Sequence, residues 1–314
     1  MATDAIAGIS APSEMARGAQ HPRGARAYAA LADYWALTKP EINFLIAIAT
    51  FAGFCLGRPT GFREFPFSLL MHTLLGTLLV ASGTGTLNQY IERCFDAQMR
   101  RTARRPLAAG RMQPSSALWF GIALSVAGAV YLAVAANFLA SGLAVATLVS
   151  YLFLYTPLKR RTPLCTLVGA LPGAMPPLIG AAAAAGRLTV EVWVLYLILF
   201  LWQFPHFMAI AWMYREDYDR AGYLVLPQGE PRARFVALQT IVPLLALVAI
   251  SLALTPPGQL RITYCVGTLL LSLGFSYYGV RFVLRRSNAA ARRLLVASII
   301  YLPALFVLIL LGRF

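Results

Sequence analysis

Charged residues are scarce in this chain. Only 12% of its 314 residues are charged, against 59% that are hydrophobic, whereas soluble domains carry roughly 25% charged residues. This shortage excludes an ordinary soluble domain and predicts an integral membrane protein. Cysteine is scarce as well: the four cysteines stand singly, without a CxxC pair, which argues against a disulfide framework or a zinc site.

Acidic residues are the scarcest charged class, with 12 against 27 basic residues and a formal net charge of +15. Such a balance is found in proteins that bind nucleic acid. In membrane proteins, however, basic residues gather in the cytoplasmic loops. We therefore expect the basic residues to lie beside the lipid bilayer, which is a partner of the protein, and we expect no nucleic acid to bind.

Long apolar runs predict the fold class, an all-α, polytopic integral membrane protein with nine transmembrane helices in a bundle around a central cavity. Each run is close to the ~20 residues that a helix needs to cross a bilayer. The fifth span contains several prolines and is expected to be kinked. The predicted spans are 40–57, 67–91, 115–136, 139–157, 164–185, 190–213, 235–254, 260–281 and 292–311.

The first residues differ in composition from the rest. Residues 1–38 are mixed in character and contain no apolar run of signal-peptide length. We predict that they form a disordered cytoplasmic tail ahead of a nine-helix transmembrane domain over 39–314. Of the 27 basic residues, 22 lie in residues 1–39 and in or at the loops after spans 2, 4, 6 and 8. By the positive-inside rule, the N-terminus is cytoplasmic and the C-terminus is outside, which predicts a multi-pass protein of the cell inner membrane.

A polar stripe stands at the end of the second span. Asn88, Glu92 and Asp96 are four residues apart, so on a helix they lie on one face about a turn apart. The alternative, a loop of surface ion pairs, does not require this register. Hard oxygen ligands suit Mg²⁺, which uses one or two carboxylates together with substrate phosphate oxygens. The stripe therefore predicts a metal site.

Basic residues surround this stripe and suggest a diphosphate. Arginine donates two hydrogen bonds from a planar fork that matches phosphate, and carboxylates alone would repel a diphosphate unless a metal lay between them. A second acidic group, centred on Asp217, follows the sixth span. The candidate diphosphate contacts are Arg101, Arg105, Lys159, Arg160 and Arg215.

Two features inside the spans remain open from sequence. The small residues 82–86 either allow close helix packing or leave room beside the helix for a substrate. His206 lies within the sixth span, about 16 Å from Asp217 at ~1.5 Å per residue. It either faces a functional cavity or is a buried histidine bonded to a neighbouring helix.

Three stretches carry a resemblance to a known family. Asn88, Glu92 and Asp96 fill an Asn followed at four-residue steps by two acids, and MRRTARRP (99–106), YTPLKRRT (155–162) and HFMAIAWMYREDYDRAGYLVLP (206–227) accompany them. At these residues the chain resembles the UbiA superfamily of intramembrane prenyltransferases, and within it the branch that farnesylates haem. It departs from the pattern at Glu92, where aspartate is usual, at Cys94, and at Ala221, which stands four positions after Asp217.

The resemblance implies a transferase of haem biosynthesis. Farnesyl diphosphate and protoheme IX (haem B) would be its substrates, and haem O and diphosphate its products. Asn88, Glu92 and Asp96 would hold Mg²⁺, Asp217 would assist catalysis, and His206 would contact haem. Haem A synthase or a terminal oxidase assembly would be a downstream partner.

Two alternatives stay open at this point. Another UbiA-type prenyltransferase, acting on a quinone or chlorophyll precursor, would share the first motif but not the MRRTARRP and WMYREDYDRAG signatures. A cation-coupled membrane transporter would also place acids at helix ends. It would have no use for arginines beside them, since they repel cations.

Overall fold

A computed structural model describes residues 23–57, 65–256 and 258–311 of the chain. Over these ranges the structure is helical without a strand, and nine helical spans are long and apolar enough to cross a membrane. The predicted all-α bundle of nine transmembrane helices is therefore confirmed for the part of the chain that is described.

The spans agree with the sequence prediction within a few residues, but α3 continues to Asp96, past its predicted end at 91, so that the whole polar stripe is helical. Two short helices lie outside the spans, α1 (Arg23–Leu37) and α10 (Arg215–Arg220). The fourth span is built from α5 (Phe138–Val149), the π-helix η2 (Ser150–Tyr155) and α6 (Thr156–Leu158). The others are α2 (Pro40–Gly57), α3 (Phe67–Asp96), α4 (Pro114–Ala135), α7 (Cys165–Gly173) with α8 (Pro176–Ala185), α9 (Val190–Met213), α11 (Pro231–Leu252), α12 (Leu260–Arg285) and α13 (Asn288–Leu311).

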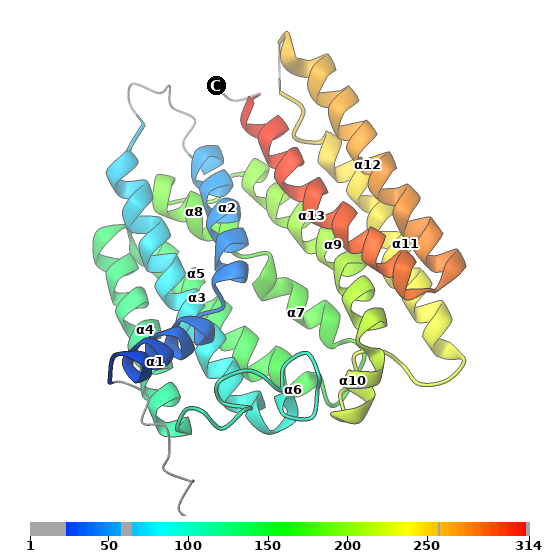
Figure 1. The fold of residues 1–314 in the computed structure, drawn as a ribbon. Coiled ribbons are helices and arrows are strands. Elements are labelled where there is room, and N and C mark those ends of the chain that lie inside the picture. The colour runs from blue at the N-terminus through cyan, green and yellow to red at the C-terminus, as the bar shows by residue number, and fades with distance from the viewer. Residues whose placement is uncertain (1–22, 58–64, 257, 312–314) are drawn as a thin grey trace, which may run out of the picture.

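The helices form two groups, with α2–α5 and α8 on one side, α9 and α11–α13 on the other, and α7 between them (Figure 1). In the first group, α3 packs along α4 and α2 along α8. A Cβ at Gly83 would collide with Ser125 and Gly121 of α4. Close helix packing thus accounts for this part of the small-residue segment 82–86.

The proline-rich span is broken, as predicted. Helix α7 ends at Gly173 and α8 begins at Pro176, because proline offers no N–H and clashes with the preceding turn. A backbone carbonyl beside the break, that of Ala170, accepts a 3.1 Å hydrogen bond from the buried Gln203 side chain of α9. The same carbonyl accepts the backbone N–H of Ala174 at 3.1 Å, so the bond from α9 is a second one at the end of α7.

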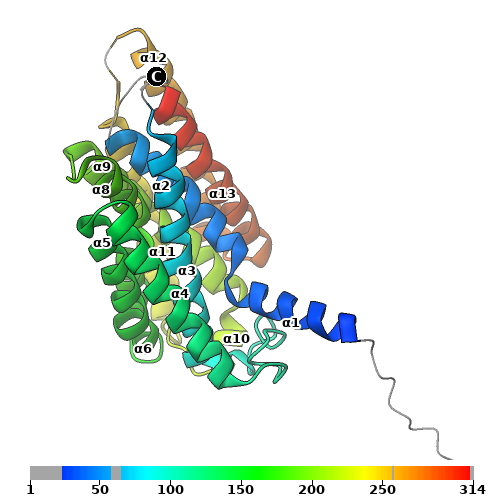
Figure 2. The same cartoon turned by 90° about the vertical axis from the view of Figure 1, so that its left-hand side faces the viewer.

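Helix α1 corrects the prediction for the N-terminal segment. A disordered tail over 1–38 is wrong for residues 23–37, which are helical and project from the bundle (Figure 2); residues 1–22 lie outside the described residues. Tyr28, Leu31 and Trp35 are exposed and spaced three and four apart, which gives α1 an apolar face of the kind that lies in a membrane interface. The other face of α1 holds Asp33, whose carboxylate accepts a 2.7 Å bond from Arg111.

The polar loops meet at one end of the bundle. Figure 1 places α1, α6 and α10 at this end and the C-terminal end of α13 at the opposite one. The three stretches that the sequence singled out therefore share one face of the membrane. That this face is the cytoplasmic one stays a prediction, and so does the division into a tail and a domain beginning at residue 39.

Candidate active site

The predicted stripe lies at the last three turns of α3. Asn88, Glu92 and Asp96 are buried, at 1%, 5% and 1% exposure. Their four-residue spacing within one helix puts them on the same face. An amide and two carboxylates buried in this way need partners, because a buried polar group without one is destabilising.

Each of the three side chains accepts a hydrogen bond from a different basic residue. The Nζ of Lys39 lies 2.8 Å from the Oδ1 of Asn88, and the Nζ of Lys159 lies 2.7 Å from an oxygen of Glu92. The third bond, also 2.7 Å, joins a guanidinium nitrogen of Arg105 to Asp96. We name these six residues the charge cluster: Lys39, Asn88, Glu92, Asp96, Arg105 and Lys159.

Lys39 is the member that sequence reasoning missed as a site residue. It stands between α1 and α2 with a positive φ of 54°, which turns the chain at that point. Gly85 of α3 faces its side chain at van der Waals distance, so the absence of a Cβ there leaves room for the lysine. Desolvation, and next the nearby positive charge of Arg105, lower the pKa of Lys39 to about 7.

Both the ammonium and the backbone of Lys159 have partners on other parts of the chain. Burial works against its charge, but the Glu92 carboxylate together with the hydroxyls of Tyr155 and Tyr151 outweighs burial and holds the pKa of Lys159 well above its usual range. The ammonium also lies 4.6 Å from the ring centre of Tyr155, an attractive cation–π distance. The backbone carbonyl of Lys159 accepts a 2.7 Å bond from the N–H of Leu224, which ties the loop after α6 to the loop after α10.

The second acidic motif reaches the same region through Asp217 of α10. This carboxylate is buried, accepts the backbone N–H of Arg101 at 3.4 Å, and pairs with Arg220 at 3.3 Å. The guanidinium of Arg101 lies over the ring of Tyr214, 5.2 Å from its centre. Asp217 therefore anchors the arginine-rich loop that follows Asp96 and carries Arg105.

Three other predicted site residues have contacts outside the charge cluster. The guanidinium of Arg160 lies 4.4 Å from the ring centre of Phe95. That of Arg215 donates 2.8 Å bonds to Asn288 and to the carbonyl of Trp212. The Nδ1 of His206 is 2.8 Å from the hydroxyl of Ser298 on α13.

The donors of the charge cluster fit a magnesium ion that is shared with a substrate. Within the described residues no three His, Cys, Asp or Glu side chains come together as a metal cage. Mg²⁺ does not require one, since it commonly takes one or two carboxylates and completes its shell with water and phosphate oxygens. Among the described residues, the buried hydroxyl of Tyr223 finds no hydrogen-bond partner, and its pKa is raised by burial and by the neighbouring Glu92 carboxylate. A further polar ligand between these groups would therefore be favourable.

The sequence also predicts a central cavity in the bundle. Both of the cavities that we describe lie along α12 and α13, and no residue of the charge cluster lines either of them. A cavity in the middle of the bundle stays a prediction.

Several known proteins are similar to this chain in sequence. The model of the UbiA prenyltransferase family matches residues 45–306. A protoheme IX farnesyltransferase of Solibacter usitatus is 51% identical over 287 residues, which cover 90% of this chain and 98% of that protein. The enzyme of the same name from Salinibacter ruber is 44% identical and covers 90% and 99% of the two chains.

Solved structures share the fold. One reported for digeranylgeranylglyceryl phosphate synthase superposes with a TM-score of 0.70 at 17% identity, over 90% of this chain and 98% of that one. A UbiA homolog from Archaeoglobus fulgidus, bound to GPP and Mg²⁺, gives a TM-score of 0.60 at 13% identity, over 88% and 99%. At these identities the likeness concerns the fold alone.

Proposed function

Because the chain belongs to the UbiA prenyltransferase family, we propose that it transfers the farnesyl group of farnesyl diphosphate to a vinyl group of protoheme IX. The products are haem O and diphosphate. The chain is an enzyme, a prenyltransferase, and a multi-pass membrane protein. Relatives up to 51% identical over nine-tenths of the chain are protoheme IX farnesyltransferases, which supports haem as the acceptor.

The observation that carries the proposal is the pairing inside the charge cluster. Three side chains of one helix face are each bonded to a cation from a different loop, namely Lys39, Arg105 and Lys159. Such a concentration of positive charge, held next to hard oxygen ligands, is complementary to a diphosphate bound through a metal. It would be a poor cation-transport site, because the three cations repel an entering cation.

The chemistry follows from the leaving group. As the bond between C1 of the farnesyl chain and the diphosphate oxygen breaks, its electron pair leaves with the diphosphate, whose negative charge grows. Preorganised cations stabilise such developing charge most strongly in a site that excludes water. Lys39, Arg105 and Lys159 are placed to do this. The backbone of Arg101 is anchored by Asp217, and its guanidinium remains a proposed further contact of the diphosphate.

Asn88, Glu92 and Asp96 would hold Mg²⁺, which when bound adds positive charge to the leaving diphosphate. The π electron pair of the haem vinyl group then forms the bond to the allylic carbon. Water adds to the cation left on the other vinyl carbon and loses a proton, which gives the hydroxyl group of the hydroxyethylfarnesyl side chain. Arg160 and Arg215 remain proposed diphosphate contacts whose side chains would have to leave Phe95 and Asn288. His206 remains a proposed haem contact.

We place the protein in the cell inner membrane, with the N-terminus and the charge cluster on the cytoplasmic side and the C-terminus outside, because basic residues gather at the end of the bundle that carries the cluster. Its product would pass to haem A synthase or to a terminal oxidase assembly.

The test is the pigment content of cells that overexpress the protein. Haem extracted from these cells is expected to contain haem O, and cells expressing Asp96→Asn at an equal membrane level are expected to contain haem B without it. Accumulation of a prenylated quinone precursor instead of haem O would assign the acceptor to another branch of the family.

A further inference from the structure

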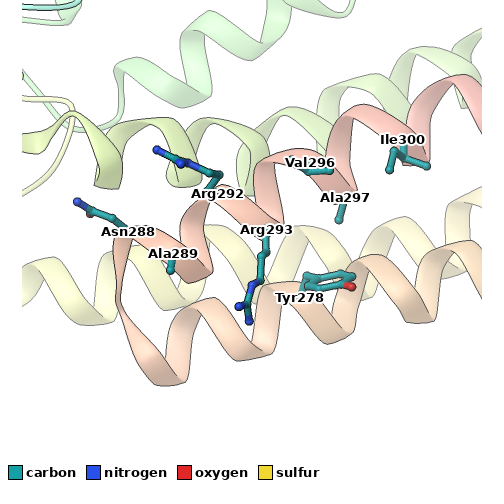
Figure 3. Close-up of a pocket in the computed structure, with 8 residues that line it drawn as sticks. All are labelled: Tyr278, Asn288, Ala289, Arg292, Arg293, Val296, Ala297 and Ile300. Carbon is teal, nitrogen blue, oxygen red and sulfur yellow. The ribbon is translucent and has the colours of Figure 1, made fainter.

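A groove lies on the side of the bundle where α13 packs on α12, away from the charge cluster. Its volume is about 560 Å³, and one long side is apolar, with Val296, Ala297 and Ile300 of α13 facing Tyr278 of α12. Figure 3 shows these side chains following α13 in one direction, with Arg292 and Arg293 at the other end. The groove is therefore amphipathic along its length.

The cationic end continues into a second, smaller cavity of about 60 Å³. Arg281, Arg285 and Arg293 line it, and it shares Tyr278 and Ala289 with the groove. Arg281 is held in place by a 2.9 Å bond to the hydroxyl of Tyr277. An apolar channel thus opens into a polar niche with three guanidinium groups.

The arginines of the groove and of the niche have no acidic residue on their own helices. The last acidic residue of the whole chain is Glu230, so α11, α12 and α13 contain none. Among the described residues, the guanidinium groups of Arg281, Arg285, Arg292 and Arg293 form no ion pair. Some other arginines at this end of the bundle are paired, as Arg105 is with Asp96 and Arg232 with Asp219. The niche is consequently a site of uncompensated positive charge.

The position of the groove on the outside of the bundle favours an anionic lipid as its ligand. Val296 and Ile300 are 50% and 60% exposed on the outer face of a transmembrane helix, where lipid tails lie. From Arg292 to Ile300 the helix rises about 12 Å at ~1.5 Å per residue, which is the length of roughly half an acyl chain. Basic pockets between transmembrane helices at the cytoplasmic interface bind anionic headgroups.

We propose that this groove binds one anionic phospholipid of the phosphatidylglycerol or cardiolipin class. Its phosphodiester lies among Arg285, Arg292 and Arg293, and an acyl chain follows Tyr278, Val296 and Ile300. The site is separate from the charge cluster and is independent of the prenyl acceptor.

Lipid retention by the purified full-length protein tests this, measured by native mass spectrometry after incubation with equal amounts of dioleoylphosphatidylglycerol and dioleoylphosphatidylcholine. The wild-type protein is expected to retain one phosphatidylglycerol in preference. The Arg292→Gln/Arg293→Gln variant is expected to bind it more weakly, by about fivefold for each arginine removed. Val296→Trp fills the apolar part while keeping every charge, and it should also lose the lipid.

Arg261→Gln is the control, because Arg261 is an exposed arginine near the opposite end of α12, and its removal lowers the net charge by one where the double variant lowers it by two. Equal retention of the two lipids, or equal losses in Arg261→Gln and Arg292→Gln/Arg293→Gln, would overturn the proposal. Displacement of the lipid by inorganic phosphate alone would show an anion site with no lipid specificity. Displacement by stoichiometric haem would assign the groove to the acceptor. Either result would also overturn it.

Discussion

The ammonium of Lys39 donates a 2.8 Å hydrogen bond to the Oδ1 of Asn88, across 49 positions of sequence. This bond brings the α1–α2 junction into the wall of the charge cluster. It also places a third cation beside the two, Lys159 and Arg105, that the motifs had already indicated. Lys39 can therefore be tested as a diphosphate ligand rather than as a residue of the N-terminal segment.

Lys39→Met should lower kcat/KM for farnesyl diphosphate by about 100-fold, the scale observed when one preorganised donor to a developing negative charge is removed. Methionine keeps an unbranched side chain, one atom shorter than that of lysine, and removes its charge. The inhibition constant of inorganic diphosphate is expected to rise in parallel, since diphosphate is the group that the lysine contacts.

Glu41→Gln is the control, because Glu41 is exposed in the first turn of α2, two residues away. It should leave both constants unchanged. If Lys39 had only a structural role, the Lys39→Met variant would lose thermal stability, but inorganic diphosphate would inhibit it as it does the wild type. That outcome would contradict the assignment of Lys39 as a diphosphate ligand.

The buried pair of Glu92 and Lys159 predicts a non-additive effect on stability. The two side chains are only 7% and 13% exposed, and removing one partner of a buried ion pair costs about 3–5 kcal/mol because the other charge remains unpaired. Lys159→Gln and Glu92→Gln should each lower the unfolding midpoint in detergent. The double variant should recover most of that loss, since neither charge is left, and it should remain inactive.

The comparison of the double variant with the singles is the decisive measurement. Additive losses would mean that the 2.7 Å contact between Lys159 and Glu92 contributes little to the folded state. Recovery of activity together with stability would remove both residues from the proposed diphosphate site.

The sequence was enough to predict the spans and the stripe, because both depend on local periodicity. Nine apolar runs and a four-residue step need no tertiary information. The partner of Asn88 was not predictable in this way, since Lys39 approaches it only once α2 packs beside α3. One signal was present: the chain has two lysines, Lys39 and Lys159, and both lie in the charge cluster. A compact ammonium fits beside Gly85, where the broader guanidinium fork would need more space.

The helix α1 and the arginine side chains mark the other limits of sequence reasoning. The spacing of Tyr28, Leu31 and Trp35 was a helical signal, but mixed composition over 1–38 obscured it. Arg105 and Arg215 looked equivalent, since both are basic neighbours of an acidic motif. The direction in which each side chain points depends on the packing of the loops. In the structure Arg105 faces Asp96 and Arg215 faces Asn288.

The effect of Mg²⁺ on the affinity for farnesyl diphosphate should depend on Asp96. Farnesyl diphosphate is expected to bind the wild-type protein tightly with Mg²⁺ and weakly after treatment with EDTA, because a diphosphate next to Glu92 and Asp96 needs a cation between them. In Asp96→Asn the affinity should be low and should no longer respond to Mg²⁺. Equilibrium binding of labelled farnesyl diphosphate measures this without turnover.

Asp219→Asn provides the comparison, since Asp219 is an exposed acid of the second motif paired with Arg232. Its response to Mg²⁺ should match that of the wild type. If Asp96→Asn kept the full effect of Mg²⁺ on affinity, the metal would have to be bound elsewhere.

The last prediction concerns His206, whose ring is oriented by two neighbours. Its Nδ1 lies 2.8 Å from the hydroxyl of Ser298, and the ring stacks on Trp202 at 4.8 Å between centres. A histidine fixed through one nitrogen presents the other in a defined direction, which is how ligating histidines are held. If Nε2 meets haem iron, addition of haem to the wild-type protein should give a ligated Soret spectrum. His206→Ala should lose that spectrum and Ser298→Ala should weaken it. An identical spectrum and haem affinity in His206→Ala would show that this histidine serves only to join α9 to α13.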